Sequence, residues 1–154
     1  SAWRGAGFDD SSWSKGKLFI GYGENFIVTQ LSDMRGGYTT VYLRKTFEVA
    51  DASAVGSLVL EAIYDDGFNA WINGVHVARA NLSSDELPYN GTASSAREDH
   101  NWNTYNLPSP AGYLVTGTNV LAIQLHNASI SGSSDCFLDV RLKESSSAGS
   151  RTGA

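Results

Sequence analysis

Cysteine, proline and charged residues are all scarce in this chain of 154 residues. The one cysteine, Cys136, excludes an internal disulfide and any zinc site built on several thiolates. Charged residues make up 18% of the sequence and leave a net charge of -5, which argues against nucleic acid as a partner. No apolar run approaches the roughly 20 residues that a membrane-spanning helix needs, so we expect no membrane span.

Helical periodicity is also nearly lacking, and short runs of alternating apolar and polar residues take its place. Hydrophobic residues make up 42% of the chain, enough for a single domain with a real core. Evenly spaced strands, with at most one helical turn at 111–115, predict an all-β fold, a two-sheet antiparallel β-sandwich of the jelly-roll kind. We expect this domain to span residues 1–144 and a flexible linker or tail to span residues 145–154.

Two strands can be placed within the predicted sheets. Residues 39–49 read TTVYLRKTFEV, and Lys45 interrupts their apolar face, so we expect that end near a sheet edge. Residues 119–127 read NVLAIQLHN and are apolar on both faces, which predicts a central strand. The alternation predicts this set of core residues: Leu58, Leu60, Ile72, Leu121, Ile123, Leu125, Leu138 and Val140.

Two turns can be read from dipeptides that favour tight hairpins. An Asn-Gly step at 73–74 predicts a hairpin between strands 68–73 and 75–79. An Asp-Gly step at 66–67 predicts a second hairpin with strand 57–65, so that three strands would form a meander. We expect a long surface loop at 86–101, followed by a strand at 102–107.

Four segments carry a resemblance to a known family. They are WRGAGFDDSSWSKGKLFIGYGENF at 3–26, YLRKTFEV at 42–49, LEAIYDDGFNAWINGVHVARAN at 60–81 and GTNVLAIQLHN at 117–127. Together they resemble the galactose-binding-like jelly roll, the fold of β-galactosidase sugar-binding domains and of many carbohydrate-binding modules. The resemblance implies a non-catalytic sugar-binding module of the kind appended to large secreted bacterial proteins.

Aromatic and amide side chains occur together at several places, a combination that suits sugars. If alternate residues of strand 68–73 face the core, Trp71 lies on the outer face, with Asn73 beside it. An equally open interpretation is that the 86–101 loop covers Trp71. Trp102 and Tyr105 follow that loop and repeat the pairing of aromatic and amide residues.

Other candidate ligand-binding residues lie at strand ends. His126 and Asn127 end the predicted central strand, where polar side chains face the loops. Tyr22 in a glycine-rich turn and Asp65 before the 66–67 turn are weaker candidates.

Catalysis is not predicted. A glycosidase needs two carboxylates about 5 to 9 Å apart across a cleft. The acids that could form such a pair are Glu24, Glu61, Asp65 and Asp139, and their spacing singles out none of them.

No cofactor is required by the residues, but the resemblance implies a possible structural calcium. Related sandwich modules often hold Ca²⁺ with an acidic residue on the last strand, which here is Asp139. The alternative is a surface ion pair of Asp139 with Arg141 or Arg44.

These observations predict a non-catalytic carbohydrate-binding module of a larger extracellular or cell-surface bacterial protein. Its expected partners are a polysaccharide or oligosaccharide and the neighbouring domains of the parent protein. The alternative is a structural spacer or interaction module without a ligand.

Overall fold

The computed structural model describes residues 1–145, so the predicted tail lies outside the described residues from residue 146 onward. Within the described part the helices are three-residue 3-10 turns, which agrees with the near absence of helical periodicity. The elements in chain order are η1 (Ala2–Arg4), β1 (Ile20–Tyr22), β2 (Thr29–Gln30), β3 (Thr40–Val49), η2 (Ala52–Ala54), β4 (Leu58–Asp65), β5 (Gly67–Ile72), β6 (Val75–Ala80), β7 (Asn103–Asn106), η3 (Pro110–Gly112), β8 (Gly117–His126) and β9 (Cys136–Glu144).

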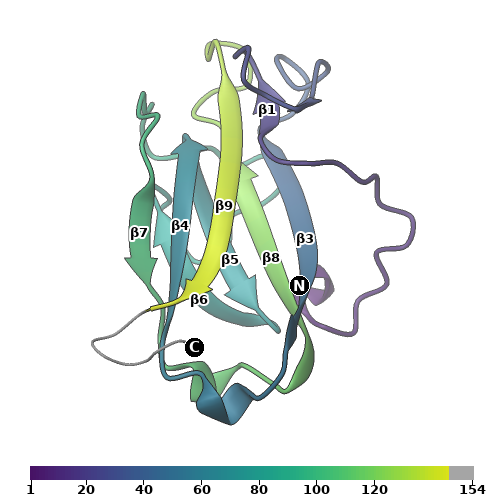
Figure 1. Ribbon diagram of the computed structural model, residues 1–154. Helices are drawn as coiled ribbons and strands as arrows, with labels where there is room; N and C mark the ends of the chain where they lie inside the picture. Colours follow the sequence, from purple (N-terminus) through teal and green to yellow (C-terminus); the bar gives the residue numbers. More distant parts are fainter. Residues whose placement is uncertain (146–154) are drawn as a thin grey trace.

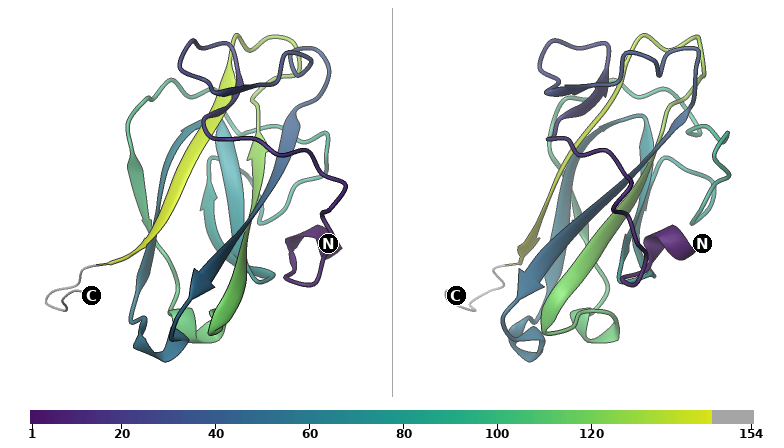
Figure 2. Two further views of the ribbon diagram at one scale, coloured as in Figure 1. Left: turned by 45° about the vertical axis from the view of Figure 1, so that its right-hand side comes forward. Right: turned by 90° about the vertical axis from the view of Figure 1, so that its right-hand side faces the viewer.

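The strands form two sheets that pack face to face, as the sequence predicts (Figures 1 and 2). One sheet has the order β2-β1-β9-β4-β7 and the other β3-β8-β5-β6. All pairings are antiparallel except the short parallel pair of β1 and β2. No described helix is long and apolar enough to cross a membrane.

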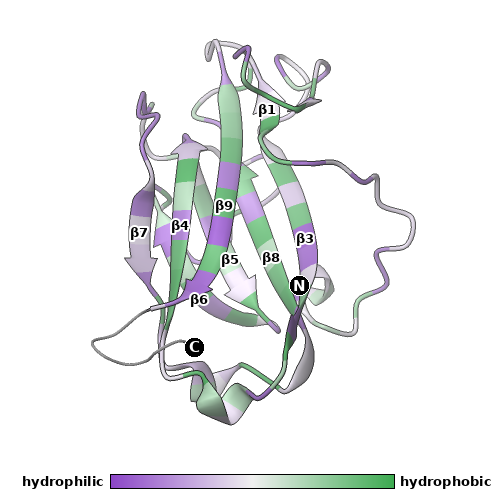
Figure 3. Cartoon of the chain, in the orientation of Figure 1, coloured by the Kyte–Doolittle hydropathy of each residue, from purple (hydrophilic) through white to green (hydrophobic). Residues whose placement is uncertain are grey.

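The core lies between the two sheets. Figure 3 shows hydrophobic residues along much of the central strands. All of the predicted core residues belong to it, with Val140 only partly buried: Leu58, Leu60, Ile72, Leu121, Ile123, Leu125, Leu138 and Val140. The period-2 alternation therefore identified the core-facing residues of β4, β5, β8 and β9 correctly.

Local signals also placed several elements. Strand β8 is central, between β3 and β5, and β3 is an edge strand, as Lys45 suggested. The hairpin of β5 and β6 turns at Asn73 and Gly74, whose φ angles of 51° and 85° are typical of a tight hairpin turn. Strand β7 confirms the predicted strand at 102–107, whereas the expected helical turn is formed by η3, slightly earlier in the chain.

The predicted meander of three strands is wrong. Strands β4 and β5 lie in different sheets, so the chain crosses the sandwich at Asp66 instead of turning back in a hairpin. Gly67 is needed because the backbone of β6 passes close by: a Cβ atom there would lie 2.8 Å from the Ala80 carbonyl oxygen and 2.9 Å from that of Asn81. The glycine therefore marks a close approach of two backbones.

The first residues of the chain run along the outside of the four-stranded sheet (Figure 2). Arg44 of β3, whose side chain is 3% exposed, holds them in place. Its guanidinium donates to the Asp10 carboxylate at 2.8 Å, to the carbonyl oxygens of Gly5 at 2.9 Å and Phe8 at 3.3 Å, and to that of Trp3. A planar guanidinium supplies all of these donors at once.

We expect Arg44→Lys to lower the free energy of unfolding by about 2 to 3 kcal/mol, because an ammonium cannot satisfy these acceptors together. Urea unfolding measures the loss, and trypsin should cut residues 4–17 faster in the folded variant. Arg79→Lys is the matched control, since the Arg79–Asp85 pair at 2.8 Å is exposed. Equal loss in both variants would contradict the anchoring role.

Candidate functional site

Trp71 lies on the outer face of the four-stranded sheet, as alternation predicts, but it is fully buried. The rings of Trp3 and His76 pack edge-on against it, with centroids at 5.3 Å and 5.5 Å, and the Arg4 guanidinium lies 5.4 Å from its centroid. The expected exposure of Trp71 is therefore wrong, because the N-terminal segment covers the ring. The expected alternative cover, the 86–101 loop, bonds to the same sheet through Leu87 and Tyr89, which contact Gln124 of β8 and Thr40 of β3.

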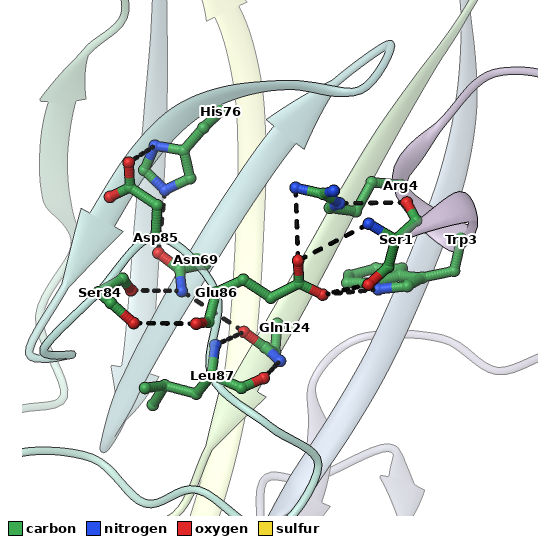
Figure 4. A network of polar contacts seen from close by, with 10 residues as sticks. All are labelled: Ser1, Trp3, Arg4, Asn69, His76, Ser84, Asp85, Glu86, Leu87 and Gln124. Atoms are coloured by element: carbon green, nitrogen blue, oxygen red, sulfur yellow. Dashed lines mark hydrogen bonds and ion pairs between the residues drawn. The ribbon is translucent and has the colours of Figure 1, made fainter.

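The amides around Trp71 are also occupied (Figure 4). Asn69 Nδ2 donates to the Ser84 carbonyl oxygen at 3.0 Å, and Asn69 Oδ1 accepts from His76 Nε2 at 2.9 Å. Gln124 binds both backbone groups of Leu87, donating at 2.6 Å and accepting at 3.2 Å. These side chains fasten the loop to the sheet, so they are not free for a sugar.

Asn73 has a structural role as well. Its Nδ2 donates to Asn119 Oδ1 at 2.8 Å and to the Tyr113 carbonyl oxygen at 2.9 Å, while its Oδ1 accepts from the Val120 amide at 2.9 Å. Every polar atom of this amide thus has a partner within the fold, and the side chain fixes the hairpin turn to β8.

Trp102 is the aromatic candidate that remains accessible, with 37% of the residue exposed. It precedes β7 on the outer face of the five-stranded sheet, and the Arg141 guanidinium lies 3.9 Å from its ring centroid. Glu61 accepts from Arg141 Nε at 2.5 Å and pairs with Lys143 Nζ at 3.2 Å. The hydrogen bond from Arg141 is the main cause that lowers the pKa of Glu61, followed by that from Lys143.

Tyr105, only three residues later, does not join this surface. Its hydroxyl donates to Tyr64 Oη at 2.8 Å, and its ring meets Phe68 of the opposite sheet at 5.4 Å. Burial raises the pKa of Tyr105. Trp102 and Tyr105 therefore lie on opposite faces of the sheet, as the alternation of a strand requires.

Four predicted residues do come together, at the end of the sandwich where β4 and β8 finish: Tyr22, Asp65, His126 and Asn127. All four are buried. Asn127 Nδ2 donates to Tyr22 Oη at 2.8 Å, and that hydroxyl donates to the Ser133 carbonyl oxygen at 2.9 Å. They therefore build the base beneath the loops and are not accessible to a polysaccharide.

His126 is held in the same base. Its Nδ1 lies 3.0 Å from both Thr40 Oγ1 and the Gly91 carbonyl oxygen. Burial lowers the pKa of His126, and the bond to Gly91 only partly offsets this effect. The imidazole is therefore neutral in the folded protein at neutral pH.

Asp65 and Asp66 are buried neighbours with different surroundings. Asp66 accepts from the Arg97 amide at 2.7 Å and the Ala128 amide at 2.8 Å, so it joins two loops. Asp65 is 0% exposed, and neither of its carboxylate oxygens has a hydrogen-bond partner among the described residues. Burial, reinforced by the nearby carboxylates, raises the pKa of Asp65 to about 10.

Asp135, just before β9, is a further acid at this end that the sequence did not single out. It is 2% exposed, and burial, followed by the effect of the neighbouring Glu24 carboxylate, raises the pKa of Asp135 to about 7. Its carboxylate belongs to two groups of potential metal ligands, one with Asp65 and Glu98 and one with Glu24 and His100.

Asp139, the predicted calcium ligand, is half-buried on β9 opposite Ile63 of β4, and burial raises its pKa. It belongs to neither group of potential ligands found among residues 1–145. The alternative ion pair is also not formed, since Arg44 pairs with Asp10 and Arg141 with Glu61. Calcium binding at Asp139 stays a prediction.

The sequence matches no family model and no curated protein. Two solved structures share the fold over 91% of the chain, each at 16% identity. They are Bacteroides uniformis beta-glucuronidase 2 covalently bound to cyclophellitol-6-carboxylate aziridine, with a TM-score of 0.58, and Bacteroides uniformis beta-glucuronidase, with a TM-score of 0.57. The chain has the fold of one part of a bacterial β-glucuronidase. The match spans 16% of each of those chains, and it confirms the predicted resemblance as a likeness of fold.

We expect acid to destabilise the protein through His126. The pKa of His126 is lower in the folded state than the usual value of about 6.5. The neutral imidazole therefore contributes fully to the free energy of unfolding above about pH 6.5, and this contribution is lost as the pH falls below this value and through the lower pKa of the folded state. Unfolding should be measured at about pH 7.5 and about pH 5.5. The His126→Asn variant should lose less stability over this interval than the wild type.

His100→Asn is the control, since His100 is exposed and this variant keeps the contribution of His126. An equal loss of stability on acidification in the wild type and in His126→Asn would show that the buried imidazole is not the group responsible.

Proposed function

We propose that this chain is a non-catalytic carbohydrate-binding module of a larger extracellular bacterial protein, and that it binds polysaccharide around Trp102. The observation that carries the proposal is an exposed indole ring, fixed beside a row of charged side chains, on a sandwich that shares its fold with part of a β-glucuronidase. The accessory role follows from the size of the match, which is a small share of that enzyme.

The chemistry of this surface suits a sugar. Arg141 lies over the indole of Trp102, so the C–H face of a pyranose would stack on the other face of the ring. Glu61 accepts and Arg141 donates, while Asn101 and Asn103, whose Nδ2 atoms already donate within the fold, offer their Oδ1 atoms as acceptors. Binding at one such shallow site is weak, because a sugar exchanges bonds with water for bonds with the protein.

The carboxylates support a module without catalysis. Glu61 is held in ion pairs with Arg141 and Lys143. Asp65 and Asp135 are close together, but at 0% and 2% exposure they do not reach a polymer in solution. A glycosidase needs both carboxylates in contact with substrate.

One observation favours the alternative of an interaction module. A hollow of about 520 Å³ opens between the edges of β3 and β9, where β1 accompanies β9 only over residues 136–138. Its apolar lining comes from Leu18, Leu43, Phe47, Leu121, Ile123, Leu138, Val140 and Leu142. A neighbouring domain of the parent protein could cover this apolar strip.

We expect Trp102→Ala to weaken binding to polysaccharide about fivefold or more, since stacking on one ring contributes about 1 kcal/mol. A pull-down on insoluble polysaccharides finds a binding polymer, and titration with an oligosaccharide from that polymer gives the affinity. Tyr89→Ala is the matched control, because Tyr89 is 74% exposed in a loop over the other sheet.

Two results would decide against this function. The first is wild-type affinity in a folded Trp102→Ala variant. The second is retention by no polysaccharide at all, which would leave the interaction module as the better account. Release of reducing ends above background would contradict the absence of catalysis.

A further inference from the structure

Two buried carboxylates at the loop end of the sandwich have oxygen atoms without partners. Both oxygens of Asp65 and Oδ1 of Asp135 are buried and accept no hydrogen bond from any of residues 1–145. Leaving an ionised carboxylate buried and unpaired is costly. Since neighbouring Asp66 is satisfied by two backbone amides, the fold can supply donors here, yet it supplies none to Asp65.

The two buried acids lie close to a third acid, Glu98. One carboxylate oxygen each from Asp65, Glu98 and Asp135 lies within 4.8 Å of the other two. Oxygens bound to one calcium ion at about 2.4 Å can be at most about 4.8 Å apart, so this spacing is compatible with a shared ion. Both oxygens of Asp65 and one oxygen of Asp135 are unpartnered, and the third acid, Glu98, is exposed to solvent.

No ion pair neutralises this group within the described part of the chain. Within residues 1–145, no basic nitrogen lies within 4.0 Å of a carboxylate oxygen of Asp65, Glu98 or Asp135. The adjacent Arg97 pairs instead with Asp99 at 2.6 Å, and its guanidinium lies 4.2 Å from the Tyr64 ring centroid. The two buried acids, with exposed Glu98 beside them, therefore form a group whose negative charge must be offset by protons or by a bound cation.

We propose that Asp65, Glu98 and Asp135 bind a calcium ion. Carboxylate oxygens are the ligands that Ca²⁺ prefers, and backbone carbonyls and water can complete its usual six to eight positions. The second group around Asp135 includes His100, a ligand better suited to zinc, but His100 packs its ring against Phe137 at 5.3 Å. The proposed site differs from the one expected at Asp139 and does not depend on the proposed sugar binding.

The ion would join three segments that are distant in the sequence. Asp65 ends β4, Glu98 belongs to the loop between β6 and β7, and Asp135 precedes β9. Binding of the ion would replace repulsion among the three carboxylates with attraction of each carboxylate to the ion. It should therefore stabilise the folded chain.

The test is thermal unfolding of the full chain at neutral pH after treatment with a chelator, with CaCl₂, MgCl₂ or ZnCl₂ added back at matched ionic strength. Calcium at about 100 times its Kd should raise the Tm by roughly 5–10 °C, and magnesium should raise it less. Calorimetric titration with CaCl₂ should give one site per chain.

Three variants locate the ion. Glu98→Gln keeps an exposed side chain of the same shape, so it should fold and lose most of the calcium-dependent shift. Asp135→Asn should lose it too. Asp139→Asn, four residues along the chain, is the matched control and should keep it.

Each other result overturns the proposal. No calcium-dependent shift in the wild type, or an unchanged shift in Glu98→Gln, would remove the site. Loss of the calcium-dependent shift in Asp139→Asn alone would show that the ion binds at Asp139 instead. A larger response to zinc than to calcium would favour the group of Glu24, His100 and Asp135.

Discussion

The chain crosses from one sheet to the other in a single residue, and the loop end of the sandwich is organised around this crossing. Asp66 stands between β4 and β5, its amide donates to the His126 carbonyl oxygen at 3.2 Å, and its carboxylate receives the amides of Arg97 and Ala128. Gly67 must lack a side chain because β6 lies against it. A crossing this short places Asp65 where water is excluded.

The outer face of the five-stranded sheet carries both features to which we assign a role. Every second residue of β4 lies on this face, among them Glu61, Ile63 and Asp65. The face therefore extends from the surface around Trp102 to the buried carboxylates. The loop that supplies Glu98 also supplies Trp102, four residues later. Holding Glu98 in place would therefore also limit how far the start of β7 can move.

Local patterns in the sequence predicted what depends on local geometry. The Asn-Gly turn, the core-facing residues of β4, β5, β8 and β9 and the central position of β8 were all recognisable, because a hairpin turn and a period of two need only neighbouring residues. The crossing at Asp66 was mistaken for a hairpin, since an Asp-Gly step fits either path and only the packing of β6 decides between them.

The candidate site was less predictable, because it depends on segments far apart in the chain. Alternation placed Trp71 on the outer face correctly, but its cover comes from Trp3 and Arg4, which no pattern around Trp71 reveals. Asp65 and Asp135 are 70 residues apart in the sequence and come together only because β9 pairs with β4. The alternation of apolar and polar residues does not show which strands are neighbours.

The half-covered edge of β9 has a consequence for how copies of this chain behave toward one another. An uncovered strand invites a second copy to extend the sheet, a route to aggregation. Lys17, Lys45 and Arg141 stand around the hollow beside this edge, so the rim is basic although the chain as a whole is acidic. If two copies met edge to edge, these like charges would come close together. Their repulsion disfavours self-association through this edge.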